Sequence, residues 1–292
     1  MTEHHRAAQR GASPQHEETP MRVGFIGLGS QGAPMARRIA EAGHPTTLWA
    51  RRPESLTPFA DTPAQTADSP AALAAASDIV CICVVTDADV EEVVTAPNGV
   101  LAGLAPNGII VIHSTVHPDT CTRLATQAAT QGITLIDAPV SGGPSAAAEG
   151  HLLIMAGGPT ETITRCHPIF TTYANPIIHL GPTGSGQLAK LLNNTLFTAN
   201  LATASGTLAL AESLGINPLK LAEVASHGSG ASFALSRLQA AGGTLAPMAP
   251  KAAPLLQKDL TLLTSLLTTA SIPPNITLQA AQTALTNLTT PH

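Results

Sequence analysis

The sequence predicts an α/β domain with a doubly wound, mostly parallel sheet, followed by an all-α domain that a long helix joins to it. Up to about residue 182, short apolar runs alternate with helical stretches, as in parallel sheets covered by helices on both faces. Beyond that point strand-like runs disappear. The helix predicted over 186–213 carries no charged residue between Lys190 and Glu212.

The chain divides into three predicted segments. Residues 1–20 are polar, rich in His, Glu and Gln, and contain no apolar run, so we expect a disordered tail rather than a secretory signal. Residues 21–182 form the predicted sheet domain, and 183–292 the helical domain. A chain of 292 residues is long enough for two medium domains with sizeable cores.

Composition narrows the possible functions and partners. A net charge of -5 without a basic stripe does not support nucleic-acid binding. The uncharged run 191–211 could span a bilayer by length, but it carries several Asn, Thr and Ser residues, so a helix buried by protein fits better. Charged residues make up only 11% of the chain, which suggests a homodimer or higher oligomer. The four cysteines lack metal or C-x-x-C spacing and indicate free thiols in a reducing, cytoplasmic compartment.

A glycine-rich turn follows the first predicted strand, 22–26, and leads into an amphipathic helix. Its spacing is G-x-G-x-x-G. The first glycine permits a tight turn, the second lets the backbone approach a pyrophosphate, and the third allows close packing of helix on strand. The phosphates then lie at the helix N-terminus. The motif predicts a Rossmann fold with a nicotinamide dinucleotide bound by Gly27, Leu28, Gly29, Ser30, Gln31 and Gly32.

The end of the second predicted strand, 46–49, indicates which dinucleotide is preferred. A protein that selects NAD offers Asp or Glu here to the ribose 2′-hydroxyl, whereas this chain has Ala50, Arg51 and Arg52. Two guanidinium groups suit a 2′-phosphate. We therefore predict that NADP(H) is preferred and that NAD(H) is possible. Two solvated arginines without this role remain the alternative.

Further candidates follow the strands predicted over 78–85, 107–112 and 133–138, because ligands of such sheets bind at the carboxyl ends of the strands. For the cofactor these residues are Val85, Thr86 and Thr115, and for the substrate Ser141, Gly142 and Gly143. The Ser141 hydroxyl and the two glycine N–H groups would form a concavity for a carboxylate, unless the segment is a plain loop. His113 and His117 have no third ligand nearby, so no metal site is predicted.

The head of the long helix carries the main catalytic candidate. Lys190 follows a glycine-rich turn, and Asn194 lies four residues later on the same helix face. Taken alone, Lys190 could be a lysine that extends to solvent at a helix end. A second lysine, Lys258, lies on a later apolar helix.

Four motifs, in this order, resemble those of the β-hydroxyacid dehydrogenase family, which includes 3-hydroxyisobutyrate dehydrogenase and tartronate semialdehyde reductase. They are the segments 27–35, 137–143, 184–194 and 258–260. The resemblance implies a Rossmann domain, a long interdomain helix, a helical dimerisation domain and a site in the cleft between them. By position, it implies that Lys190 is catalytic, that Ser141, Gly142 and Asn194 bind substrate, and that Lys258 closes over substrate and cofactor.

The activity expected from these features is hydride transfer between nicotinamide and a small β-hydroxy acid or semialdehyde. One group must exchange the hydroxyl proton, and Lys190 is the candidate general acid/base. An exposed lysine has a pKa near ~10.4. Burial and the positive end of the helix dipole would lower that pKa. Asn194 would hold the same hydroxyl or the lysine head.

Three segments depart from the family pattern and leave the substrate and the physiological direction open. Residues 111–113 lack an acid, 241–254 form an Ala/Pro/Gly-rich loop, and 283–292 lack the usual glycine and aspartate. One alternative is an NADPH-dependent imine reductase, but that group usually has Asp or Tyr in place of Lys190. Another is a catalytically silent scaffold of the same fold. The presence of Lys190, Asn194 and Ser141 together argues against it.

Overall fold

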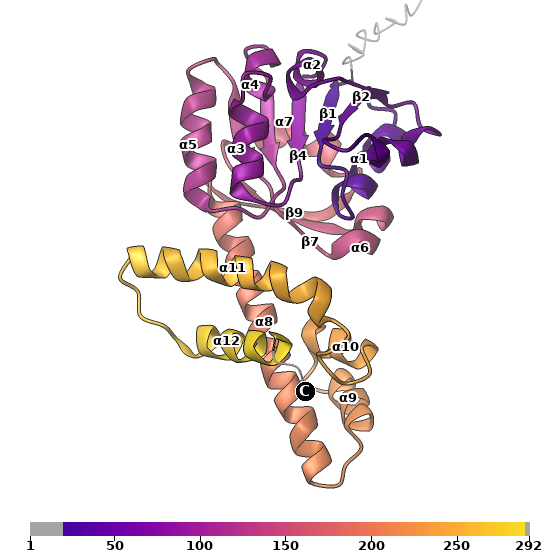
Figure 1. Ribbon diagram of the computed structural model, residues 1–292, viewed down its shortest axis with the longest axis vertical. Coiled ribbons are helices and arrows are strands. Elements are labelled where there is room, and N and C mark those ends of the chain that lie inside the picture. The colour runs from indigo at the N-terminus through magenta and orange to yellow at the C-terminus, as the bar shows by residue number, and fades with distance from the viewer. Residues whose placement is uncertain (1–19, 290–292) are drawn as a thin grey trace, which may run out of the picture.

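The computed structural model describes residues 20–289, so the tail predicted over 1–20 lies, apart from Pro20, outside the described residues. Figure 1 shows the sheet domain above the helical domain, with α8 running from one into the other. In chain order the elements are β1 (Val23–Ile26), α1 (Gly32–Glu41), β2 (Thr46–Trp49), the 3-10 helix η1 (Pro53–Phe59), β3 (Gln65–Thr66), α2 (Pro70–Ala75), β4 (Ile79–Ile82), α3 (Asp87–Thr95), α4 (Val100–Gly103), β5 (Ile109–Ile112), α5 (Pro118–Ala129), β6 (Thr134–Asp137), β7 (Val140–Ser141), α6 (Gly143–Glu149), β8 (Leu152–Gly157), α7 (Thr160–Phe170), β9 (Ala174–Gly181), α8 (Ser185–Ser213), α9 (Pro218–His227), α10 (Phe233–Ala240), α11 (Ala249–Thr269) and α12 (Ile276–Thr289).

The described residues form one nine-stranded sheet in which six strands run in the order β3-β2-β1-β4-β5-β6. These six are parallel, and Ile26 at the end of β1 lies between Trp49 of β2 and Ile82 of β4. The chain winds outward in both directions from β1, so the switch point lies between β1 and β4, where ligands bind in such sheets. The prediction of a doubly wound, mostly parallel sheet is confirmed.

Four of the nine strands were not predicted: β3, β7, β8 and β9. β8 runs antiparallel to β6, and β7 and β9 pair with β8. Most residues of β9 are exposed or partly exposed, and β3 and β7 have two residues each. β3, β7 and β9 therefore lack the long apolar run that marks a strand buried on both faces. β8 does have such a run, Leu152–Gly157, and most of it is buried.

Two apolar layers cover the faces of the sheet. Neighbouring residues of a strand point to opposite faces, so Phe25 packs in the layer with Met35 of α1, and Ile26 in the layer with Leu124 of α5. Because both faces are buried, every residue of β1, β4 and β5 is buried. This explains why the central strands appear in the sequence as unbroken apolar runs.

The helical domain is built around α8. Leu201 and Leu208 of α8 pack with Leu238 of α10, Leu260 of α11 and Leu285 of α12. Residues 260–289, which carry no charged side chain, therefore find cover on α8 of their own chain. α11 begins at Ala249, so the segment 241–254, expected as a loop, is partly helical. No helix among residues 20–289 is long and apolar enough to cross a membrane.

Candidate active site

The glycine turn, residues 27–32, follows β1 at the switch point. Gly27 has φ +98°, and a Cβ there would lie 2.2 Å from the carbonyl oxygen of Cys83. A Cβ on Gly32 would lie 2.0 Å from the oxygen of Gly27, whereas one on Gly29 would meet no atom within 4 Å. Packing thus requires glycine at Gly27 and Gly32. Gly29 instead faces open space before the N-terminus of α1, which suits a bound pyrophosphate.

The two arginines after β2 differ in their surroundings. The Arg51 guanidinium lies 2.7 Å from Oδ1 of Asp89 and 3.5 Å from Oε2 of Glu92, both on α3. Arg52 is exposed, and its side chain has no hydrogen bond or ion pair with any described residue. The ion pair of Arg51 leaves no local pattern in the sequence, because its partners Asp89 and Glu92 are 38 and more residues away along the chain.

Thr86, a cofactor-binding candidate, caps α3. Its hydroxyl donates to Oδ2 of Asp89 (2.7 Å) and accepts from the Asp89 N–H (3.1 Å), while its own N–H donates to Asp89 Oδ2 (3.1 Å). The helix predicted to begin after Thr86 is therefore present, with a reciprocal capping box. The Val85 side chain beside it is exposed.

His113 belongs to the core of the sheet domain. Its Nδ1–H donates to the Ala138 carbonyl (2.7 Å), and the Tyr173 hydroxyl donates to its Nε2 (3.1 Å). Burial lowers the pKa of His113 to about 4, so the ring is neutral at physiological pH. Both ring nitrogens are used within the protein, which leaves neither for a ligand.

The first turn of α8 is fixed to the ends of β5 and β6. Asp137, fully buried at the end of β6, accepts from the N–H groups of Gly184 (2.6 Å) and Gln187 (2.7 Å). Burial raises the pKa of the Asp137 carboxyl, and these N–H donors oppose the rise. The Gln187 side chain accepts from the Val116 N–H (3.1 Å) and donates to the Ser114 carbonyl (2.8 Å). Asp137 and Gln187 thereby set the position of α8.

Lys190 lies in the second turn of α8 and is partly buried. Its ammonium has no hydrogen bond or ion pair with a residue of the described range 20–289. Burial lowers the pKa of Lys190 to about 8, against the opposing charge of Asp259 and with a smaller lowering from Lys258. A lysine with a pKa near 8 can both donate and accept a proton near neutral pH.

Asp259 of α11 was not selected as a site residue from the sequence, yet it lies beside both α8 candidates. It is 5% exposed, and its Oδ2 accepts from the Asn194 amide (2.6 Å). Its Oδ1 has no hydrogen-bond partner among the described residues; Nζ of Lys258 lies 3.6 Å away. The signal that could have identified it is an acid on an apolar helix face next to a candidate lysine.

Lys258 joins the helical domain to the strand ends. Its ammonium donates to the backbone oxygens of Val85 (3.2 Å) and Thr115 (2.5 Å), which follow β4 and β5. The structure therefore brings together three of the predicted cofactor-binding residues at one point. Figure 1 shows α11, which carries Lys258, crossing α8 just below the sheet domain.

The candidate substrate loop forms a separate turn beyond β7. Gly142 has φ +131° and Gly143 φ +79°, and a Cβ on Gly142 would lie 2.7 Å from that of Ala146. A Cβ on Gly143 would face open space. The Ser141 hydroxyl has no hydrogen bond within the described residues, and none joins this turn to Lys190. The predicted residues thus form four groups: the glycine turn, the arginines after β2 with Thr86 at Asp89, the cluster of Lys190, Asn194 and Lys258 around Asp259, and this loop.

Two family models together match almost all of the described chain. Residues 22–181 match the NAD binding domain of 6-phosphogluconate dehydrogenase. Residues 184–289 match a domain described as NAD-binding of NADP-dependent 3-hydroxyisobutyrate dehydrogenase. The break between the two matches falls immediately before α8.

Individual proteins agree with these matches. An uncharacterised oxidoreductase of Mycobacterium tuberculosis is 38% identical over 290 residues, covering 95% of this chain and 96% of that protein. The 3-hydroxyisobutyrate dehydrogenase of Pseudomonas aeruginosa is 34% identical, covering 78% and 76%. The solved structure of the M. tuberculosis 3-hydroxyisobutyrate dehydrogenase with L-serine has a TM-score of 0.80 at 26% identity, covering 90% and 92%. This chain belongs to the β-hydroxyacid dehydrogenase family and is an NAD(P)-dependent dehydrogenase of the 3-hydroxyisobutyrate dehydrogenase type.

Proposed function

We propose that this enzyme transfers a hydride between NADP(H) and a small β-hydroxy acid or its semialdehyde, with Lys190 as general acid/base. The observation that carries the proposal is the environment of Lys190: its ammonium is unpaired within residues 20–289, and burial lowers its pKa to about 8. The bound nicotinamide would accept or supply the hydride. The protein must then exchange one proton with the substrate oxygen.

The roles of the other residues follow from their contacts. Asn194, held through its amide by Asp259, would orient the substrate hydroxyl next to Lys190. Ser141, Gly142 and Gly143 would bind the substrate carboxylate, since the Ser141 hydroxyl is unpaired within the described residues and Gly143 faces open space. Lys258 would hold the helical domain against the cofactor site through the Val85 and Thr115 oxygens.

The preference for NADP(H) rests on Ala50, Arg51 and Arg52 after β2. No acid stands at the strand end to bind a ribose 2′-hydroxyl, and the Arg52 guanidinium is unpaired within the described part of the chain. The matching family described as NADP-dependent supports the same preference. NAD(H) remains a possible second cofactor.

The direct test is turnover with a panel of small β-hydroxy acids and semialdehydes. Absorbance at the reduced-nicotinamide band should change with NADP(H) and at least one member of the panel. The same assay with cyclic imines and NADPH tests the imine reductase alternative. Imine reduction without any hydroxy-acid or semialdehyde turnover would refute the proposal, and no turnover of either class would favour a silent scaffold.

We also propose a homodimer or higher oligomer in the cytoplasm. Leu188, Leu192 and Leu196 form a stripe along α8, and they are 43%, 52% and 53% exposed. Cover by a second subunit would remove this apolar area from water. The four free cysteines suit a reducing compartment. Light scattering at micromolar concentration should give at least twice the monomer mass, and a monomer there would contradict the oligomer.

A further inference from the structure

We propose that Asp89 and Glu92 determine how strongly the enzyme prefers a 2′-phosphorylated cofactor. They hold Arg51 against α3 and offset its charge, so a 2′-phosphate competes with them for Arg51, whereas Arg52 can bind it directly. The inference rests on the proposed function. At the adenosine end of the site, the two arginines would strengthen NADP(H) binding and the two acids would weaken it.

The ion pair spans the switch point of the sheet. Arg51 follows β2, and Asp89 and Glu92 lie on the helix after β4, while β1 lies between these two strands. The contact of 2.7 Å between Arg51 and Asp89 therefore links the two sides of the crevice that begins at the glycine turn. In this class of sheets the adenosine half of a dinucleotide lies in that crevice, and its ribose faces the end of β2.

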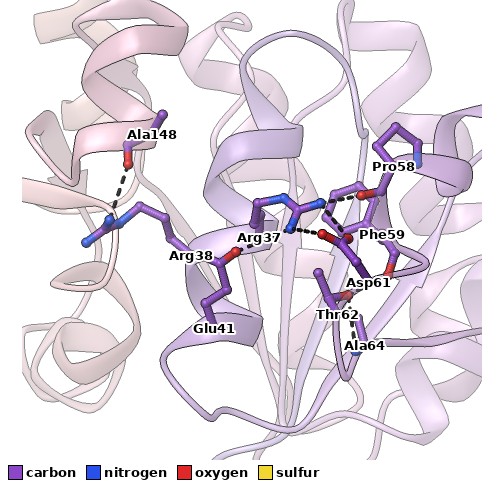
Figure 2. Close-up of polar contacts among 9 residues, drawn as sticks. All are labelled: Arg37, Arg38, Glu41, Pro58, Phe59, Asp61, Thr62, Ala64 and Ala148. Carbon is purple, nitrogen blue, oxygen red and sulfur yellow. Dashed lines mark hydrogen bonds and ion pairs between the residues drawn. The ribbon is translucent and has the colours of Figure 1, made fainter.

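The segment that follows Arg52 is held by α1 near the end of η1, and Figure 2 shows these contacts. Arg37 of α1 donates to the Pro58 carbonyl and pairs with Asp61 (2.9 Å) just after η1. Its guanidinium also lies 5.7 Å from the centre of the Phe59 ring. η1 begins at Pro53, directly after Arg52. The Arg52 carbonyl also accepts from the Ser55 N–H (3.0 Å), so its backbone is anchored, while its guanidinium is unpaired within the described residues and that of Arg51 is not.

The charges at this end cancel before any ligand binds. Arg51 and Arg52 carry two positive charges, and Asp89 and Glu92 two negative ones. A 2′-phosphate adds nearly two more negative charges. Glu92 would repel it, and the repulsion would be weakened by the surrounding solvent. A ribose 2′-hydroxyl carries no charge and leaves the Arg51 ion pair undisturbed. The two acids should thus weaken NADP binding and hardly alter NAD binding.

The test uses two fragments of the cofactor, adenosine 2′,5′-bisphosphate and 5′-AMP, bound to the full-length protein and followed by calorimetry. Glu92→Gln should tighten the bisphosphate about threefold at low ionic strength, with the gain shrinking as salt screens the charges. The affinity for 5′-AMP should stay unchanged. Glu92 is 68% exposed, so its substitution leaves the fold intact.

Glu91→Gln is the matched control. Glu91 is the neighbour of Glu92 on α3, but it pairs with Arg123 of α5, away from Arg51. The control removes the same charge from the same helix and should change neither affinity. If both variants bound the bisphosphate equally more tightly, the cause would be the net charge of the protein rather than the acid beside Arg51, and the proposal would be overturned.

The remaining outcomes separate this inference from the proposed function. If wild type prefers the bisphosphate and Glu92→Gln weakens it or leaves it unchanged, the acids orient Arg51 or play no part, and only this inference fails. If wild type binds both fragments equally, the NADP preference fails as well. Asp89→Gln is less suitable as a first variant, because Oδ2 of Asp89 also caps α3.

Discussion

The two ends of the proposed cofactor cleft each place a cation beside carboxylates, but in opposite surroundings. Arg51 is 61% exposed beside Asp89 and Glu92, whereas Lys190 is partly buried near Asp259, which is 5% exposed. Exposed charges are screened by water and salt, so their pairing tunes binding weakly. Charges in a buried cluster instead change proton affinity. The comparison suggests that one end discriminates between cofactors and the other prepares a proton donor and acceptor.

The largest expected effect is the loss of turnover when Lys190 can no longer exchange a proton. Lys190→Arg should lower kcat by roughly 10²–10⁴, because a guanidinium keeps its proton in the working pH range. NADPH affinity, measured by fluorescence titration, should stay near that of wild type, since the glycine turn lies in the other domain. An Arg variant with near-normal kcat would mean that Lys190 is only a charged group at a helix end.

The second effect is on stability. Burial of Lys190 lowers its pKa from 10.5 to about 8, so below pH ~8 the fold bears the full cost of burying the charged form. That cost declines as pH rises toward ~10.5, because the folded state then binds fewer protons than the unfolded state. Lys190→Met should therefore raise the free energy of unfolding at pH 7, by at most ~3 kcal/mol, while abolishing activity.

Chemical denaturation between pH 7 and 10 measures this gain, which should shrink as pH rises. Lys220→Met is a matched control, because the Lys220 side chain is 79% exposed on α9. It should change stability little at any pH in this range. If Lys190→Met were less stable than wild type at pH 7, burial of the charged lysine would not destabilise the fold as we expect.

The contrast between the two ends also shows what the sequence could predict. β1, β4 and β5 were predictable because strands buried on both faces appear as unbroken apolar runs, and the glycine turn because its G-x-G-x-x-G spacing is itself the signal. Lys190 and Asn194 stand one helical turn apart, so their shared face follows from spacing alone. Each of these features leaves a pattern within a short stretch of the sequence, even where the contact behind it is distant, as between Gly27 and Cys83.

The missed features depend on contacts between distant segments. Asp259 meets Asn194 across 65 residues, and Arg51 meets Asp89 across 38. Neither pairing leaves a local pattern, because helix spacing does not determine which helices become neighbours. β9 has a related explanation: its mostly exposed residues form a strand because they pair with β8, and no apolar run within β9 predicts that pairing.

The third prediction tests the exposed end. Arg51→Ala should weaken NADPH binding about tenfold and leave NADH almost unchanged, because it removes a charge-assisted phosphate contact and leaves two acids unpaired. The difference should narrow at high salt. Titrations of both cofactors at two ionic strengths would measure it, and an equal loss for NADPH and NADH would contradict a role at the 2′-phosphate.

The smallest effect is a shift in pH dependence at the buried end, and its sign is the test. Asp259 raises the pKa of Lys190 and Lys258 lowers it. Oxidation of a hydroxy acid needs neutral Lys190, so kcat/KM should fall on the acid side with an apparent pKa near 8. Asp259→Asn keeps an oxygen for the Asn194 amide and removes the charge, so the acid limb of the kcat/KM profile should move to lower pH. Lys258→Gln should move it to higher pH, whatever its effect on KM.

The effect of salt should also differ between the exposed Arg51 site and the buried Lys190 site. Screening acts weakly on buried charges, so the opposite shifts of Asp259→Asn and Lys258→Gln should persist at an ionic strength that removes the effect of Glu92→Gln. If Asp259 only held Asn194 in place, Asp259→Asn would lower kcat without moving the limb. Shifts of both variants in the same direction would show that packing, rather than charge, sets the pKa of Lys190.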